Sequence, residues 1–225
     1  MITVIIPCLN ERANINLIKQ NIGLFNNCKH IIVDGSSRDA SSAAFIKEKL
    51  NFIVTKPSRG LQLRKGAEAS NTKWLLFLHA DTKLNKKNIS DIYSFMLVKN
   101  TFKVGFFKIK FRNKLILANL ISNWANLRTK IFKLPFGDQG LLISRYYYFK
   151  LGGHPKEKIM EDLEFILKVP KKNRLLLNSK ISTSFRKYQK NGIFLQGITH
   201  LFCQIIFLLN FKKGLIHKIY KKNEK

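Results

Sequence analysis

Apolar residues in the first 80 positions group into four runs of five to seven residues, separated by longer mixed stretches. The runs are residues 2–7, 30–34, 51–55 and 73–79. Their length and continuity are typical of strands buried on both faces of a parallel sheet. The mixed stretches, 11–25, 39–50 and 61–71, are long enough for helices. This alternation predicts an α/β fold with a parallel, doubly wound sheet and right-handed crossovers.

The pattern is less regular in the second half of the chain. Residues 102–111 alternate loosely between apolar and polar side chains, which predicts a strand with one exposed face. Residues 140–144 form another short apolar run, and 114–132 have the spacing of an amphipathic helix. A further helix is predicted over 157–169, where Pro170 ends it. The sequence has no internal repeat and no Ser/Gly-rich linker, so the pattern marks no firm domain boundary.

The chain is strongly basic, with 41 Lys and Arg against 13 Asp and Glu and a net charge of +28. Such a charge attracts polyanions: nucleic acid, anionic lipid or phosphorylated ligands. Heavy use of Lys, Asn, Ile and Phe is also typical of proteins from AT-rich genomes, so a background bias is an alternative source of the charge. Cys8, Cys28 and Cys203 are scattered without metal-type spacing, which favours a reducing cytosol. The first residues show no secretory signal, so we expect a cytoplasmic protein.

Candidate ligand-binding residues lie at or just after the ends of three of the predicted strands, which is where ligands bind in doubly wound sheets. They are Pro7, Asn10 and Glu11 after the first strand, Asp34, Gly35, Ser36 and Ser37 after the second, and His79 and Asp81 after the fourth. Asp34 could accept hydrogen bonds from a base or a ribose, and the helix start that follows it suits a phosphate. The alternative is an ordinary strand-to-helix turn in which Ser37 or Asp39 is an N-cap.

Two further acidic positions carry candidate chemistry. Asp81, just past a buried strand in "HADT", is well placed to bind a divalent cation that bridges phosphate oxygens, although a lone Asp is often only a turn residue. "IMEDLEF" sets Glu161 and Asp162 among apolar neighbours. If that helix docks over the strand ends, Asp162 is a partly desolvated carboxylate suited to general-base catalysis. Otherwise the two acids belong to a solvated first helical turn, where they favour the helix dipole.

Taken in order, "PCLNE", "DGSSRD", "HADT" and "MED" resemble the family-2 glycosyltransferases of the GT-A fold. The resemblance runs from Met1 to about Tyr188, and "SRGLQLRKGA", "GDQG" and "LGGHP" are similar to motifs of a small bacterial branch with a single catalytic domain. It implies a Rossmann-like, mostly parallel sheet flanked by helices. We therefore expect a GT-A catalytic domain over 1–190 and a separate helical tail over 191–225.

The same resemblance implies a role for each matched residue. Asp81 would hold Mn²⁺ or Mg²⁺ on the diphosphate of a UDP- or GDP-sugar, and Asp162 would deprotonate the acceptor hydroxyl in an inverting displacement. The nucleotide, the diphosphate and the sugar or acceptor would be contacted by Pro7, Asn10, Glu11, Asp34, Ser36, Arg59, Gln62, Asp138, Glu161 and Arg186. Two positions depart from the family pattern: His79 replaces the first acid of the DxD motif, and Arg64 stands where Asn is usual.

The predicted tail suggests where the protein acts. Residues 192–211 are apolar but are broken at helical spacing by Gln196, His200, Gln204 and Asn210, and lysines follow at once. This pattern favours an amphipathic helix lying in the plane of the cytoplasmic membrane surface, with packing as ordinary core as the alternative. Membrane proximity would suit a lipid-linked acceptor.

Two other functions compete with sugar transfer. A nucleic-acid-binding protein would use the basic charge, but no recognition motif is present and acids clustered at the strand ends would repel a polyanion. A sugar-phosphate nucleotidyltransferase would be expected to have a Gly-rich N-terminal loop with a basic residue, which "PCLNE" lacks. We therefore expect a nucleotide-sugar partner and no nucleic acid.

Overall fold

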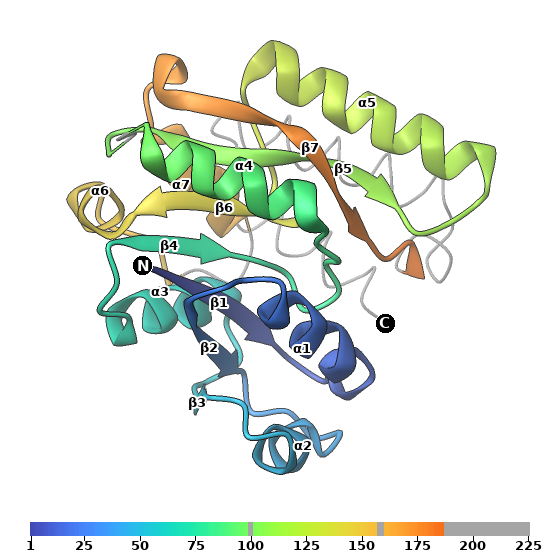
Figure 1. The fold of residues 1–225 in the computed structure, drawn as a ribbon, viewed down its shortest axis with the longest axis vertical. Helices are drawn as coiled ribbons and strands as arrows, with labels where there is room; N and C mark the ends of the chain where they lie inside the picture. Colours follow the sequence, from blue (N-terminus) through green and yellow to red (C-terminus); the bar gives the residue numbers. More distant parts are fainter. Residues whose placement is uncertain (99–100, 157–159, 187–225) are drawn as a thin grey trace, which may run out of the picture.

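The computed structural model describes residues 1–98, 101–156 and 160–186, and within them seven strands form one sheet (Figure 1). The strands are β1 (Ile2–Cys8), β2 (Cys28–Asp34), β3 (Phe52–Val54), β4 (Trp74–Phe77), β5 (Val104–Phe111), β6 (Leu141–Ser144) and β7 (Arg174–Thr183). Their order across the sheet is β3-β2-β1-β4-β6-β5-β7. Among the described pairings, β6 runs antiparallel to both of its neighbours and the rest are parallel. The expected mostly parallel sheet is therefore confirmed.

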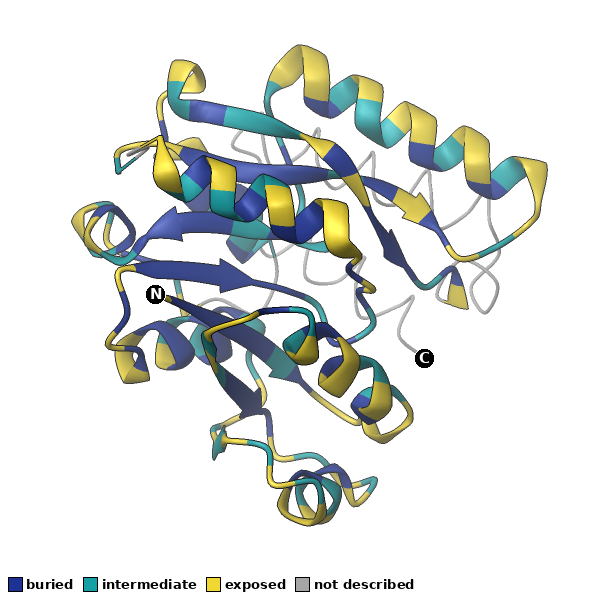
Figure 2. Cartoon of the chain, in the orientation of Figure 1, coloured by how far each residue is buried: buried dark blue, intermediate teal, exposed yellow. Residues whose placement is uncertain are grey.

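Helices cover both faces of this sheet. They are α1 (Ile15–Gly23), α2 (Ser41–Lys47), α3 (Arg59–Ala69), α4 (Lys86–Leu97), α5 (Ile116–Phe132), α6 (Arg145–Lys150) and α7 (Glu161–Leu167). In the central strand β1, Val4 and Ile6 face a core layer built with α1, α2, α4 and α5, while Ile5 faces the layer built with α3, α6 and α7. The strands at the centre of the sheet are consequently buried along their length (Figure 2). No helix within the described ranges has the length and apolarity needed to cross a bilayer.

The ends of β1, β2 and β4 point to the same side of the sheet (Figure 1), which we call the carboxyl edge. β1 continues through Pro7 to Cys8, so Pro7 does not end the strand as the sequence suggested. Proline is tolerated there because the pairing of β1 with β4 stops at Ile5, and the missing N–H of Pro7 lies beyond it. The carboxyl edge is where the polar residues singled out in the sequence lie.

Two element predictions need correction, and three elements were missed. The 102–111 strand does not have an exposed face along its length: β5 lies between β6 and β7, and Val104–Phe107 are buried. The 157–169 helix begins only at Glu161, because Met160 has a left-handed backbone (φ 61°) that a helix cannot pass through. The pattern gave no indication of α4, α6 or β7. The predicted tail, 191–225, lies outside the described residues.

The close packing of α3 on β1 and β2 yields a test of the fold. Gly66 of α3 lies against Ile5 and Val33, and a Cβ at this position would overlap the Ile5 side chain. We expect Gly66→Ala to lower the free energy of unfolding by about 1–3 kcal/mol, because α3 would have to shift away from the sheet. Urea denaturation measures this change.

Gly23→Ala is the matched control, because Gly23 is the exposed last residue of α1 and a Cβ added there would have no other atom within 4 Å. Alanine favours a helix over glycine, so the control should be neutral or slightly stabilising. Equal losses from the two substitutions would contradict the close approach of α3 to the sheet.

Candidate active site

The loops after β1 and β2 hold each other in place. The Asn10 amide N–H donates to the Ser37 hydroxyl at 2.8 Å, and the Asn10 side-chain oxygen accepts from the Arg38 N–H at 2.8 Å. Asn10 and Ser36 both have left-handed backbones (φ 56° and 63°), and the Ser36 hydroxyl donates to the Thr55 carbonyl at 2.8 Å. These exposed turns form a polar surface beyond the ends of β1 and β2.

Gln62 of α3 joins the same two strands from below this surface. Its side-chain amide donates to the carbonyl oxygens of Cys8 at 2.8 Å and Val33 at 2.7 Å. The residue is buried, and the chain at Gly35 passes directly over its amide group. Gln62 therefore acts on the site by fixing the strand ends, and its predicted contact with a nucleotide is untested.

Asp34, the last residue of β2, is fully buried. Its carboxylate accepts hydrogen bonds from the Ser37 N–H at 3.2 and 3.3 Å, from the Ser37 hydroxyl, and from the Ser42 hydroxyl at 2.7 Å. Both oxygens are thus used to shape the turn into α2. Contact with a base would require one of these serines to release the carboxylate, and it remains a prediction.

The loop that carries Asp81 is held by its backbone. Asn21 of α1 donates to the Thr82 carbonyl at 2.6 Å and accepts from the Leu84 N–H at 2.8 Å. Arg112 donates to the Asp81 carbonyl at 2.8 Å. The Asp81 side chain stays 22% exposed, and one of its oxygens lies 3.5 Å from the Thr183 hydroxyl at the end of β7. Its carboxylate is therefore positioned but still accessible.

A second group of charges forms where α3 and α7 begin. The Arg59 guanidinium lies 2.7 Å from Glu161 Oε1 through Nε and 3.2 Å from Asp162 Oδ2 through Nη2. Gly137 leaves the space for this fork, since a Cβ there would overlap both Arg59 and Asp162. Glu161 is buried, whereas the Asp162 side chain is 22% exposed. The first turn of α7 is therefore not the solvated turn considered as the alternative from sequence.

The carboxyl groups at this edge influence one another. Burial raises the pKa of Asp138, opposed by Arg128 and Arg59, and repulsion from Asp81 and Asp162 adds to the rise. The pKa of Asp138 is thus affected by the charges of both the Asp81 loop and the start of α7. Burial likewise raises the pKa of the neighbouring Glu161 well above its usual range.

His154, in the "LGGHP" motif, is the site residue whose role sequence reasoning missed. Its ring is buried between Phe77 and Phe165, and its Nε2 lies 3.7 Å from Asp162 Oδ1. The Tyr148 oxygen accepts from the His154 backbone N–H at 3.0 Å, so the Tyr148 hydroxyl is left to donate to Nδ1, also at 3.0 Å. Nδ1 as acceptor assigns the proton of the neutral ring to Nε2, which faces Asp162.

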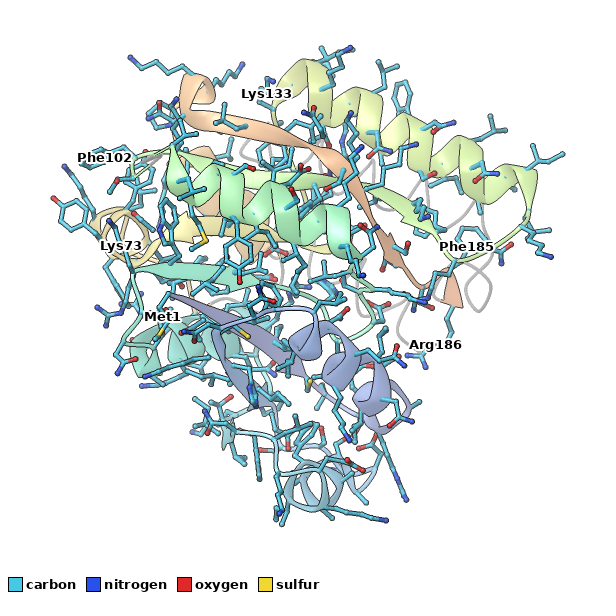
Figure 3. All side chains as sticks on the ribbon, viewed as in Figure 1. Met1, Lys73, Phe102, Lys133, Phe185 and Arg186 are labelled. Carbon is cyan, nitrogen blue, oxygen red and sulfur yellow. The ribbon has the colours of Figure 1, made fainter. Side chains whose placement is uncertain are left out.

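The remaining predicted site residues lie along the same carboxyl edge. Glu11 follows β1 and accepts a hydrogen bond from the Asn14 side chain. Arg186, the last described residue, follows β7 three positions after Thr183; Figure 3 labels it at the opposite side of the molecule from Met1 and Lys73. The next residue, Lys187, is also basic and lies outside the described residues.

These residues suit a metal ion that is shared with a ligand. Within the described ranges, no group of three or more His, Cys, Asp or Glu side chains could hold an ion by itself. Mg²⁺ and similar ions are often bound by one or two carboxylates together with substrate phosphates. A partly exposed Asp81, whose charge contributes to the raised pKa of Asp138, fits that kind of donor set.

A hollow of about 440 Å³ opens away from this edge, at the start of β1. It is lined by Met1, Ile2, Asn26, Asn27, Tyr93 and Met96. Its lining holds no carboxylate or imidazole, unlike the carboxyl edge.

Comparison with known families shows the class of enzyme to which the chain belongs. The model of Glycosyl transferase family 2 matches residues 3–150, which is more than half of the chain. The protein therefore belongs to glycosyl transferase family 2. Among curated proteins, no sequence matches the chain.

Solved structures of glycosyltransferases share the fold, and the expected GT-A architecture is confirmed. S. aureus TarS 1-349 in complex with UDP-GlcNAc is 16% identical, with a TM-score of 0.63 over 97% of this chain and 70% of that one. The mannosyltransferase PcManGT from Pyrobaculum calidifontis, in complex with GDP-Man and Mn²⁺, is 16% identical, with a TM-score of 0.67 over 89% of this chain and 61% of that one. Glucosyl-3-phosphoglycerate synthase from Mycobacterium tuberculosis, with Mn²⁺, UDP-glucose and phosphoglyceric acid, is 13% identical, with a TM-score of 0.56 over 82% and 70% of the two chains.

Burial of His154 gives the stability of the protein a pH dependence. Burial lowers the pKa of His154 from 6.5 to about 4, with Asp162 opposing the change. Between these two pH values His154 is protonated in the unfolded chain but neutral in the folded protein. The free energy of unfolding therefore falls as the pH falls, by up to about 1.4 kcal/mol per pH unit.

We expect His154→Phe to keep the ring packing and to lose this part of the pH dependence of the free energy of unfolding. Urea unfolding of the two proteins at several pH values from 4 to 7 would show a flatter profile for the variant below pH 6.5. Parallel profiles would mean that His154 is protonated equally in the folded and unfolded states.

Proposed function

We propose that this glycosyltransferase moves a sugar from a nucleotide-diphosphate donor to an acceptor hydroxyl, with Asp162 as general base and inversion at the anomeric carbon. The observation that carries the proposal is the setting of Asp162: a partly exposed carboxylate on the same edge as Asp81, held by Arg59 at 3.2 Å and faced by His154 Nε2. A single base on one side of the sugar and a leaving group on the other is the arrangement that an inverting displacement requires.

The donor would bind across the ends of β1, β2 and β4. The turns around Asn10 and Ser36 offer polar backbone and side-chain groups to the nucleoside. Asp81, beside Thr183, would hold a divalent cation on the diphosphate. Such a cation supplies positive charge that stabilises the departing diphosphate. The similarity to structures bound to UDP-GlcNAc and GDP-Man supports a nucleotide sugar as donor.

The acceptor would approach Asp162 at the start of α7. Arg59 Nη2 lies 3.2 Å from Asp162 Oδ2 and His154 Nε2 lies 3.7 Å from Oδ1, so the two neighbours limit the rotation of this carboxyl group and orient it for the acceptor hydroxyl. Transfer of the acceptor proton to Asp162 would make the acceptor oxygen more nucleophilic as it attacks the anomeric carbon. Asp138, whose pKa is raised by burial and by repulsion from Asp81 and Asp162, would contact the sugar or the acceptor.

Replacing the proposed base should separate chemistry from donor binding. We expect Asp162→Asn to reduce kcat by about 10²–10⁴-fold, because an amide cannot take the acceptor proton. The affinity for nucleoside diphosphate, measured by calorimetry, should stay unchanged.

Glu164→Gln removes the same charge from the same helix and serves as the control with near-normal turnover. If nucleoside diphosphate binding failed together with turnover in Asp162→Asn, Asp162 would be a donor-binding or structural residue. Release of pyrophosphate in place of nucleoside diphosphate would identify a nucleotidyltransferase.

The metal assignment rests on the Asp81 side chain and can be tested without unfolding the protein. Asn21 and Arg112 hold the loop through backbone atoms, so Asp81→Ala should melt at nearly the wild-type temperature. We expect it to lose turnover in Mn²⁺ and to lose Mn²⁺ binding in the presence of UDP, followed by electron paramagnetic resonance. Wild-type activity in Mn²⁺ would refute the assignment.

A further inference from the structure

Helix α5 presents large apolar side chains to the solvent. They recur at intervals of three or four residues and so form one stripe along the 17-residue helix. The stripe consists of Ile116, Leu120, Trp124, Leu127 and Ile131, each 48–79% exposed, with Phe132 beside its end. Figure 2 shows this outer side of α5 as exposed, with buried positions directed toward the sheet. Apolar surface gathered on one helix face in this way marks an interaction site.

The opposite side of α5 is small or polar. Ala118, Ser122 and Thr129 are the buried residues of the helix, and the Asn126 side chain bonds the N–H and carbonyl of Ile109 in β5 at 2.8 and 2.9 Å. An ordinary surface helix buries its large apolar side chains and exposes the polar ones. In α5, Ile121 and Ala125 pack against the core, but the five large apolar side chains of the stripe are exposed, so packing within this domain does not account for the stripe.

The charge around the stripe indicates what covers it. From Ile92 to Gly137 the chain contains nine Lys or Arg residues and no Asp or Glu. Lys114 precedes the stripe, Lys130 lies within its last turn, and both are exposed. A second copy of the chain would bring the same positive charge, and so would the lysines on both sides of the apolar stretch 192–211, since residues 187–225 contain a single acid. An anionic lipid surface matches both the apolar stripe and the basic residues at its ends.

We propose that α5 is a membrane-docking face that lies in the interface of an anionic bilayer, with Trp124 at its centre. Both ends of the helix lead to the active-site loops: Arg112 bonds the Asp81 carbonyl, and the Arg128 guanidinium lies 4.0 Å from the ring centre of Phe136, next to Gly137. Docking would therefore keep the carboxyl edge near the lipid surface. A lipid-linked acceptor follows if the proposed transferase function also holds, whereas the docking itself does not depend on it.

The two tryptophans make this proposal measurable on the full chain. Trp74 is 3% exposed and Trp124 is 58% exposed, so a change in surroundings at the stripe is reported by Trp124. Vesicles of phosphatidylcholine mixed with anionic phosphatidylglycerol should shift the emission to shorter wavelength at low salt. Brominated lipid should quench it, and pure phosphatidylcholine vesicles should do much less. Trp124→Phe should still sediment with the vesicles while losing the shift.

Two variants compare acidic substitutions on the stripe with an acidic substitution elsewhere on the surface. Leu120→Asp with Leu127→Asp should weaken sedimentation with anionic vesicles about tenfold or more, because two charges would enter the apolar interface. Ile46→Asp, on exposed α2 at the far end of the molecule from α5 (Figure 1), should bind as the wild type does. Thermal melts establish that each variant is folded.

Three results would overturn the proposal. Equal binding by the stripe variant and the wild type would assign the attraction to another surface, including residues 187–225. Equal binding to neutral and anionic vesicles would exclude the charge complementarity. Shielding of Trp124 from acrylamide before vesicles are added would show that the protein itself, or a second copy, covers the stripe.

Discussion

The fork of Arg59 is the contact on which the acidic end of the site depends. It connects the start of α3 with the start of α7, across the backbone at Gly137. Glu161 and Asp162 are adjacent acids, one of them buried, and without a cation their repulsion and desolvation would favour protonation or displacement of the helix start. A planar guanidinium can meet both carboxyl groups at once, which a lysine ammonium cannot do with the same geometry. The position of the proposed base is thus held by a residue from the other half of the chain.

Two kinds of support meet at the carboxyl edge. On the side of β1 and β2, neutral hydrogen bonds from Asn10 and Gln62 fix loop backbones and leave polar groups exposed. On the side of β4 and α7, acidic groups influence one another, and burial together with repulsion from Asp162 raises the pKa of both Asp138 and Glu161. The first arrangement suits recognition of a rigid nucleoside, and the second suits a reaction in which charge moves. Antiparallel β6 allows this contrast, because it brings the Gly137–Gln139 turn to the edge from the reverse direction.

The sequence predicted those strands and helices that depend on the local pattern of apolar and polar residues. Short apolar runs located β1 to β4, and the acids after them located the carboxyl edge. β7 was missed because Asn178, Ser179 and Lys180 interrupt its apolar residues, as an edge strand with one partner permits. Pattern also predicted that α5 is amphipathic, but not that its apolar side faces outward, since periodicity does not say which face meets the sheet. The pairing of His154 with Asp162 depends on the fold of the residues between them.

The contacts of Asp81 span a long stretch of chain. Its hydroxyl neighbour, Thr183, is 102 residues later, and the adjoining backbone pair joins Lys83 to Ser182. The strands β1 to β4, by contrast, pair within the first 77 residues. During synthesis from the amino end, the proposed nucleoside side of the site can therefore form well before β7 exists. The proposed metal loop gains its last contacts only with β7, so a chain that stopped before β7 would have the turns after β1 and β2 but not the complete support of the Asp81 loop.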